Sequence, residues 1–155
     1  MKSRLSPHTT APKEIQALQK LSMQIKDGLE PKLVHLVLTR VSQINGCAYC
    51  LHMHTQEARA DGETEERLYL LNAWRESLMF TPRERAALGW AESLTRVADT
   101  HAPDADYEEA AKHFSEQELV KLTLLIGAIN IWNRIAIGFR IVHPAESEKI
   151  QAAAE

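Results

Sequence analysis

Both cysteines of the chain lie in one short stretch, INGCAYCLHMHT at residues 44–55, with two of its seven histidines. Cys50 follows Cys47 by three residues, and His54 follows Cys50 by four. If a helix begins at Cys47, this spacing places the three side chains on one face. Cα atoms three residues apart in a helix are separated by about 5 Å, which a disulfide can bridge. The stretch therefore predicts a thiol pair that can form and release a disulfide within an intact helix.

The expected position at the start of a helix also favours thiol reactivity. The helix dipole and the free N–H groups of the first turn stabilise a thiolate, which is the nucleophilic form of cysteine. His54 is within reach of Cys50 to take its proton, so the stretch can supply a nucleophile, a base and a second, resolving thiol. The dipole alone favours Cys47 as the nucleophile, whereas the nearby histidine favours Cys50.

The residues alone leave other interpretations open. Four candidate zinc ligands are present: Cys47, Cys50, His52 and His54. However, structural zinc sites usually take two ligand pairs from separate parts of a chain, and His52 and His54 lie about 200° apart around a helix. Cysteines that only pack a core are also common. A thioredoxin-type CxxC motif would be expected beside a βαβ pattern, which this sequence lacks.

Composition narrows the possible function classes. The chain has 155 residues, of which 45% are hydrophobic and 25% charged, as in an ordinary globular domain. Its net charge of −3 argues against nucleic acid or an anionic membrane as the main partner. The apolar stretch at residues 122–132 is too short to span a bilayer, and residues 1–14 lack the apolar core of a secretory signal. We therefore expect a cytoplasmic protein with no membrane or nucleic-acid partner, where a structural disulfide would be unusual.

Helical spacing of apolar residues runs through most of the chain, and no clear alternating strand pattern appears, so the predicted fold class is all-α. In the first half, it predicts helices over residues 12–28, 33–45, 47–61 and 65–76. The first of these should bury a face formed by Ile15, Leu18, Leu21, Ile25 and Leu29. The run Leu36-Val37-Leu38 in the second would also suit a buried strand.

The second half of the chain carries two capping boxes, TPRE at residues 81–84 and SEQE at 115–118. They predict a helix running toward Val97 and a long apolar helix reaching Ile137. Asp104 or Asp106 can cap a short helix between them. We expect a single domain over residues 1–155, with its core at about 12–142 and loose termini at about 1–10 and 145–155.

The segment RVSQINGCAYCLHMHTQEAR, residues 40–59, closely resembles the core of the alkylhydroperoxidase D-like family, a branch of the carboxymuconolactone decarboxylase superfamily. Residues 80–95 and 114–140 resemble later segments of the same family. The resemblance covers most of residues 15–140. It implies a helical domain of about six to eight helices that assembles as a homotrimer or homohexamer and reduces hydroperoxides without a metal or haem.

The resemblance also implies roles for individual residues. In family members the second cysteine of the motif attacks the peroxide, the first condenses with the resulting sulfenic acid, and a histidine relays the proton. Cys50 then corresponds to the peroxidatic thiol, Cys47 to the resolving thiol and His54 to the relay. An external dithiol closes the cycle, such as a lipoyl group on a partner protein or a thioredoxin-like protein.

Two positions depart from the family pattern. The family usually has a glutamate twelve residues before the first cysteine as the base of the relay, and this sequence has His35. A histidine can act as a base near neutral pH, but His35 could equally be a core residue. Tyr49 stands where some members have a histidine, and could shape the pocket or give its hydroxyl a partner.

The polar run at Asn130, Trp132, Asn133 and Arg134 also matches a family segment. These residues could line the site, although hydrogen bonding within the core or at a subunit interface is the favoured interpretation.

The predicted function is therefore a thiol-dependent hydroperoxide reductase. The alternative is a thiol–disulfide oxidoreductase or redox sensor of the same fold, with little peroxidase activity. A decarboxylase would not need the CxxC motif, and a non-enzymatic assembly protein would keep its behaviour without the cysteines.

Overall fold

The computed structural model describes residues 2–145, and all regular structure in this range is helical. The all-α class is therefore confirmed. The described residues form α1 (Pro7–Thr10), α2 (Pro12–Lys26), α3 (Pro31–Asn45), α4 (Ala48–Ala60), α5 (Glu65–Leu70), the 3₁₀ helix η1 (Leu71–Glu76), α6 (Pro82–Thr95), α7 (Val97–Thr100), α8 (Asp104–Ala111) and α9 (Glu116–Phe139). The number of α-helices exceeds the expected six to eight because α1 and α7 are four-residue turns.

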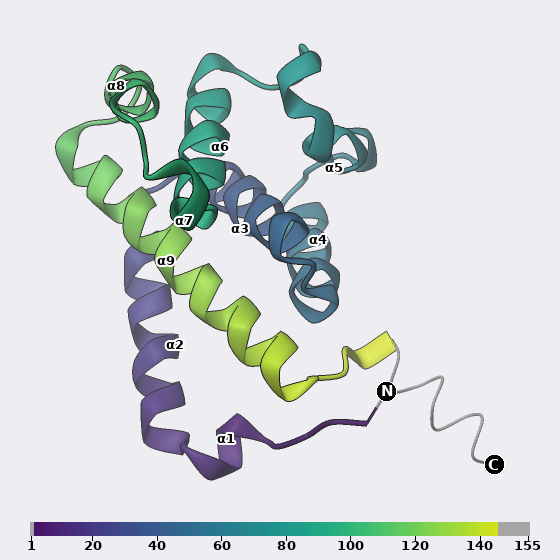
Figure 1. The fold of residues 1–155 in the computed structure, drawn as a ribbon. Coiled ribbons are helices and arrows are strands. Elements are labelled where there is room, and N and C mark those ends of the chain that lie inside the picture. Colours follow the sequence, from purple (N-terminus) through teal and green to yellow (C-terminus); the bar gives the residue numbers. More distant parts are fainter. Residues whose placement is uncertain (1, 146–155) are drawn as a thin grey trace.

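Helix α3 forms the centre of the molecule (Figure 1). It contacts α4, α6, α9 and η1, and its residues from Leu33 to Ser42 are all buried. A helix enclosed on all sides can carry apolar residues all round rather than on one stripe. This enclosure explains why Leu36, Val37 and Leu38 follow one another and could also suit a buried strand. The helix ends at Gly46, whose φ of 69° is in the left-handed region that favours glycine.

Both predicted capping boxes are present. At the start of α6, the hydroxyl of Thr81 accepts from the backbone N–H of Glu84, whose carboxylate accepts from the N–H of Thr81. Ser115 and Glu118 make the same exchange at the start of α9. Neither aspartate caps α8, because Pro103 is its N-cap and Asp104 is its first residue. Local hydrogen-bonding signals therefore predicted the starts of α6 and α9 correctly, but not the cap of α8.

Helix α9 is longer than the apolar stretch at 122–132 that the sequence analysis considered too short to span a bilayer. By length and composition alone, its 24 residues could cross a membrane. A single such helix is weak evidence of a span, because the core helix of a soluble protein passes the same test. In this fold α9 packs against α2, α3 and α6, and Leu122, Leu125 and Ile126 are buried in the main core. We therefore interpret it as a core helix.

The N-terminal part differs from expectation in two places. Leu21 of α2 is 46% exposed, so only part of the expected face, including Ile15 and Ile25, is buried. Within the segment expected to be loose, α1 is helical, and the backbone N–H of Arg4 donates to Phe139 O at 2.9 Å. Figure 1 shows this segment running past the end of α9. Of the C-terminal segment expected to be loose, residues 146–155 lie outside the described residues.

A buried ionic cluster holds α3 against α6 and η1. The carboxylate of Glu92 in α6 accepts hydrogen bonds from Arg40 Nε (2.8 Å) and Trp74 Nε1 (2.9 Å), and also from Arg75. Arg40 and Glu92 are each 6% exposed. Because Arg40 lies in the same helix that leads to Cys47, this cluster helps to fix the position of that end of the chain.

Candidate active site

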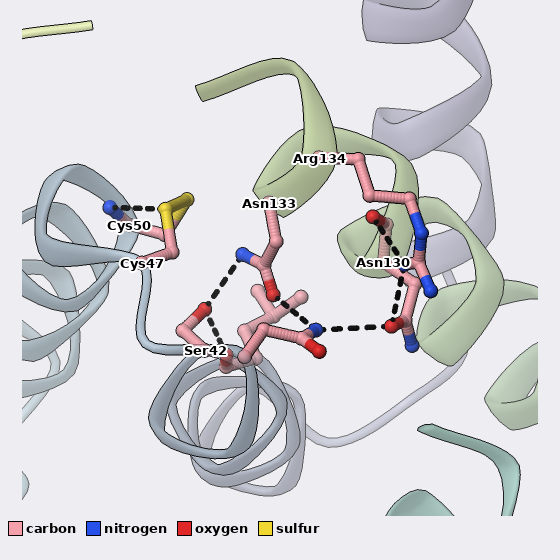
Figure 2. The surroundings of a disulfide bond; sticks show 8 residues. Ser42, Cys47, Cys50, Asn130, Asn133 and Arg134 are labelled. Atoms are coloured by element: carbon pink, nitrogen blue, oxygen red, sulfur yellow. Dashed lines mark hydrogen bonds between the residues drawn. A yellow bond between two sulfur atoms is a disulfide. The ribbon is translucent and has the colours of Figure 1, made fainter. Parts of the chain in front are cut away.

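The two cysteines lie at the N-terminus of α4 and are joined by a disulfide (Figure 2). Their Cα atoms are 5.3 Å apart, close to the separation expected from helical spacing. Cys47 is the N-cap rather than the first helical residue, and its Sγ accepts from the backbone N–H of Cys50 at 3.3 Å. The sulfur thus acts as the hydrogen-bond acceptor that an N-cap side chain usually provides. Both residues are buried, with 1% and 2% exposure.

A hydrogen-bonded joint between α3 and α9 holds the start of α4 in place. The backbone N–H of Cys47 donates to Ser42 O at 3.0 Å. The hydroxyl of Ser42 accepts from Asn133 Nδ2 at 3.1 Å, as Figure 2 shows. Asn45 Nδ2 donates to Asn133 Oδ1 at 2.8 Å and to Asn130 Oδ1 at 3.0 Å. The favoured interpretation of both asparagines, hydrogen bonding within the helical core, is therefore confirmed, and Arg134 lies exposed on this joint, bonded to Asn130.

A cavity of about 430 Å³ lies between α2, α4 and α9. Cys50 and His54 both line it, and its walls are largely apolar, with Leu38, Leu125 and Ile129 among them. Within the described part of the chain, Cys47 is not one of the lining residues. A small molecule in this cavity would therefore contact Cys50 rather than Cys47.

Two aromatic residues of the sequence analysis also line this cavity. Tyr49 lies between the cysteines in sequence and contributes to the wall, which is compatible with the expectation that it shapes the pocket. Trp132 of α9 lines the cavity as well, and its indole N–H donates to Ser22 Oγ of α2 at 3.0 Å. Of the polar run in α9, Trp132 is thus the member that reaches the site.

His54 is 4% exposed and has two different ring environments. Its Nδ1 lies 2.9 Å from Glu57 Oε2, one turn further along α4. Its Nε2 is buried and has no hydrogen-bond partner among the described residues. The hydrogen bond to His54 lowers the pKa of Glu57, and the charges of Lys26 and His35 lower it further, against the opposing effect of burial. Glu57 therefore provides an ionised carboxylate beside the histidine.

Sequence reasoning missed Glu57, although a local signal was present. His54 and Glu57 are three residues apart, a spacing at which side chains of a helix are neighbours. The family pattern instead places the carboxylate at position 35, where this sequence has a histidine.

His35 has a partner of its own. Its Nε2 lies 2.7 Å from Oδ2 of Asp61, the C-cap of α4. The His35 side chain is largely buried, and its Nδ1 has no hydrogen-bond partner in the described part of the chain. His35 is not one of the described residues that line the cavity, although its charge is felt by Glu57. The structure thus brings Cys50 and His54 to one cavity, with Cys47 bonded to Cys50, and leaves His35 outside the described lining.

The four residues considered as zinc ligands do not converge on one point. The two sulfurs are bonded to each other, and His54 faces Glu57. The ring of His52 stacks on that of His143, with centroids 4.9 Å apart. Across residues 2–145, no group of three or more histidine, cysteine, aspartate or glutamate side chains is placed to hold a metal ion.

Comparisons with known proteins place the chain among its relatives. Residues 11–93 match the carboxymuconolactone decarboxylase family. The uncharacterized protein YdfG of Bacillus subtilis (strain 168) is 39% identical over 138 residues, which are 88% of this chain and 94% of that protein.

Solved structures share the fold. A protein of unknown function from Agrobacterium tumefaciens, for which a role as an antioxidant defence protein AhpD has been suggested, is 46% identical. It superposes with a TM-score of 0.89 over 92% of this chain and 99% of that one. The debrominase Bmp8 superposes with a TM-score of 0.76 at 18% identity, covering 88% of this chain and 74% of its own. This last likeness concerns the fold alone, and a fold by itself does not define a reaction. The family match and the near-complete coverage of YdfG show that this chain belongs to the carboxymuconolactone decarboxylase family, with the helical fold of its AhpD-like members.

Proposed function

We propose that this protein is a thiol-dependent hydroperoxide reductase in which Cys50 is the nucleophile, Cys47 the resolving thiol and His54 the base. One observation carries the proposal. Cys50 and His54 line the same largely apolar cavity, while Cys47 is bonded to Cys50 from outside its lining. This arrangement distinguishes the two sulfurs, which helix-dipole reasoning alone does not.

These positions suggest how the thiol pair would reduce the peroxide and become oxidised itself. In the dithiol form, His54 takes the proton of Cys50, and the thiolate attacks the terminal oxygen of the hydroperoxide. The O–O bond breaks, Cys50 becomes a sulfenic acid, and the departing alkoxide takes the proton from His54 to leave as an alcohol. The thiol of Cys47 then attacks the sulfenic sulfur, which releases water and forms the disulfide. The peroxide gains two electrons and the thiol pair loses them.

The cycle closes when an external dithiol reduces the Cys47–Cys50 bridge by thiol–disulfide exchange and becomes a disulfide itself. Both sulfurs are nearly fully buried, so the donor must reach them through the cavity. A small dithiol on a flexible arm, such as a lipoyl group carried by a partner protein, fits this requirement better than a thiol on the surface of a thioredoxin-like protein.

The homo-oligomeric state and the cellular compartment of the protein are also part of the proposal. Helix α9 presents exposed apolar side chains, of which Val120 is 60% exposed, Leu124 48% and Ile131 47%. An exposed apolar face of this kind is typical of a protein–protein interface. It is compatible with the homotrimer or homohexamer that the resemblance implies. The small peroxide, the dithiol donor and a cytoplasmic setting are likewise proposals.

Steady-state turnover of tert-butyl hydroperoxide with dihydrolipoamide as the reductant tests this function. His54→Gln should lower kcat/KM for the peroxide roughly 100-fold or more, because a general base contributes about 10²- to 10⁴-fold. His52→Gln is the matched control, since this histidine lies on the same helix and stacks on His143; we expect it to retain activity within about twofold, as for a substitution away from the reacting atoms. Wild-type turnover no faster than the uncatalysed reaction would reject the peroxidase and favour the alternative, a thiol–disulfide oxidoreductase or redox sensor.

A further inference from the structure

We propose that Glu57 of α4 is the carboxylate that orients His54 for the reaction. In the family pattern, this carboxylate would instead stand at position 35 in α3. The inference rests on the proposed peroxidase function and deepens it. Glu57 acts through His54 and is therefore a positioning residue.

The first argument is the geometry of the two histidine nitrogens. Glu57 Oε2 lies 2.9 Å from His54 Nδ1, and both side chains line the cavity with Cys50. A carboxylate beside Nδ1 accepts its N–H and so favours the neutral tautomer with an unprotonated Nε2. That Nε2 is buried and has no hydrogen-bond partner among the described residues. It is thus the ring atom available to take the proton of Cys50, as in the serine–histidine–aspartate arrangement of hydrolases.

The second argument is the position of the competing residue. His35 Nε2 lies 2.7 Å from Asp61 Oδ2, so this ring bonds to the C-cap of α4. His35 does not belong to the described lining of the cavity. Its charge acts on Glu57, whose pKa it helps to lower.

The third argument is the charge around Glu57. Three side chains of opposite charge, or able to acquire it, act on this carboxylate: His54 on its own helix, Lys26 of α2 and His35 of α3. Across the cavity, the described wall residues of α9 are apolar, with Leu125 and Ile129 among them, and α1 contributes one further titratable wall residue, His8. The pKa of Glu57 is lowered, mainly by the hydrogen bond to His54. The carboxylate is therefore ionised at neutral pH and can stabilise the imidazolium that forms when His54 accepts a proton.

This arrangement predicts how the Cys50 thiol responds to pH. When Glu57 stabilises protonated His54, the imidazolium in turn stabilises the thiolate of Cys50. Glu57→Gln removes the charge but keeps the size of the side chain. The imidazolium becomes less stable, so the thiolate should form at a higher pH.

The test measures the rate of iodoacetamide alkylation against pH in a Cys47→Ser background, where Cys50 is the sole thiol. Serine is a favourable N-cap, so α4 should still begin at the same place. We expect Glu57→Gln to raise the midpoint of the profile by about one pH unit. In the protein with both cysteines, the same variant should slow peroxide turnover roughly 10- to 100-fold at neutral pH. Glu66→Gln, an exposed position on α5, is the matched control and should leave both quantities unchanged.

His35→Gln provides the competing arm of the experiment, and a midpoint shift smaller than that of Glu57→Gln is expected. A larger shift for His35→Gln, or superimposable profiles for Glu57→Gln and its background, would overturn the inference. If Glu57→Gln shifts the midpoint but the wild-type protein reduces no peroxide, the peroxidase proposal fails and the positioning role of Glu57 stands. Normal wild-type turnover with an unshifted Glu57→Gln profile rejects the positioning role alone.

A second measurement needs no variant at position 57. Nitrogen-15 chemical shifts of the reduced wild-type protein report which nitrogen of His54 carries the proton, and a His54→Gln sample assigns the signals. Protonation at Nδ1 in the neutral ring is the expected result. A neutral ring protonated at Nε2 would overturn the inference, because Glu57 could then not be accepting its N–H.

Discussion

Replacement of Glu92 by glutamine tests whether the buried ionic cluster stabilises the scaffold that presents the cysteines. Glu92 Oε1 accepts from Arg40 Nε at 2.8 Å and from Trp74 Nε1 at 2.9 Å, and Oε2 accepts from Arg75. Glutamine has nearly the same shape. It removes the negative charge and places an amide donor or a single carbonyl where two acceptors stood.

The expected cost follows from burial. Arg40 is 6% exposed, so its guanidinium would be left without a counter-charge in the interior. Breaking a buried ion pair in this way costs about 3–5 kcal/mol. The glutamine carbonyl can still accept from Arg40 or Trp74, which places the expected loss near the lower end, at about 3 kcal/mol. This is a large share of the roughly 5–15 kcal/mol by which a domain is usually stable.

Urea unfolding at neutral pH and a fixed protomer concentration measures this loss. Glu109→Gln is the matched control, because Glu109 pairs with Lys112 at 2.7 Å on the surface and its removal should change little. A loss for Glu92→Gln no greater than that of the control would refute the reasoning, since it would mean that Arg40 finds water or another acceptor.

The same substitution makes a prediction about pH. Burial alone would raise the pKa of Glu92, but hydrogen bonds from Arg75, Trp74 and Arg40 outweigh it, and the pKa lies below its usual value of 4.5. A carboxylate with a lowered pKa stabilises the fold above that usual value and loses this effect as the pH falls through its folded pKa. The difference between wild type and Glu92→Gln should therefore shrink in acid.

Three further predictions concern the cysteine pair, a helix cap and the joint beneath α4. Cys47→Ser should retain a sulfenic acid on Cys50 after one equivalent of peroxide, seen by mass spectrometry as one added oxygen; an unmodified thiol would contradict the assigned roles. Hydrogen bonds from the backbone and side chain of Ser115, and then from Arg83, lower the pKa of Glu118 to about 2. Glu118→Gln should therefore lower the free energy of unfolding by about 1 kcal/mol at neutral pH, allowing for solvent screening. Urea unfolding should show this loss disappearing as the pH falls from 4.5 toward 2. A loss that does not change with pH would refute this prediction. Asn133→Leu should lower the unfolding free energy by about 2 kcal/mol by removing hydrogen bonds to Ser42 and Asn45. An unchanged value would mean that these hydrogen bonds contribute little to stability.

The features that sequence predicted well depend on local chemistry. The capping boxes at Thr81 and Ser115 need only residues within one turn, so their pattern is sufficient. The disulfide between Cys47 and Cys50 likewise depends on a separation of three residues at the start of one helix. The all-α class followed from apolar periodicity that extends over most of the chain.

The features that sequence missed depend on neighbours distant in the chain. Leu21 has the spacing of a buried residue, but whether its face is covered depends on how α2 lies against α9. The bond from His35 to Asp61 joins residues 26 positions apart, and nothing in either local sequence indicates it. The role expected for His35 came from the family pattern, and no contact in the described structure tests it directly. The cavity beside Cys50 also requires three helices to be placed before it can be seen.

The central claim is that Cys50 is oxidised by a hydroperoxide and then captured by Cys47. The most direct test adds one equivalent of tert-butyl hydroperoxide to fully reduced, metal-free protein and follows the intact mass and the free thiols over time. The account predicts that wild type rapidly loses both thiols and two hydrogens, while Cys50→Ser keeps its remaining thiol. Wild-type thiols that persist as long as those of an uncatalysed dithiol would contradict it.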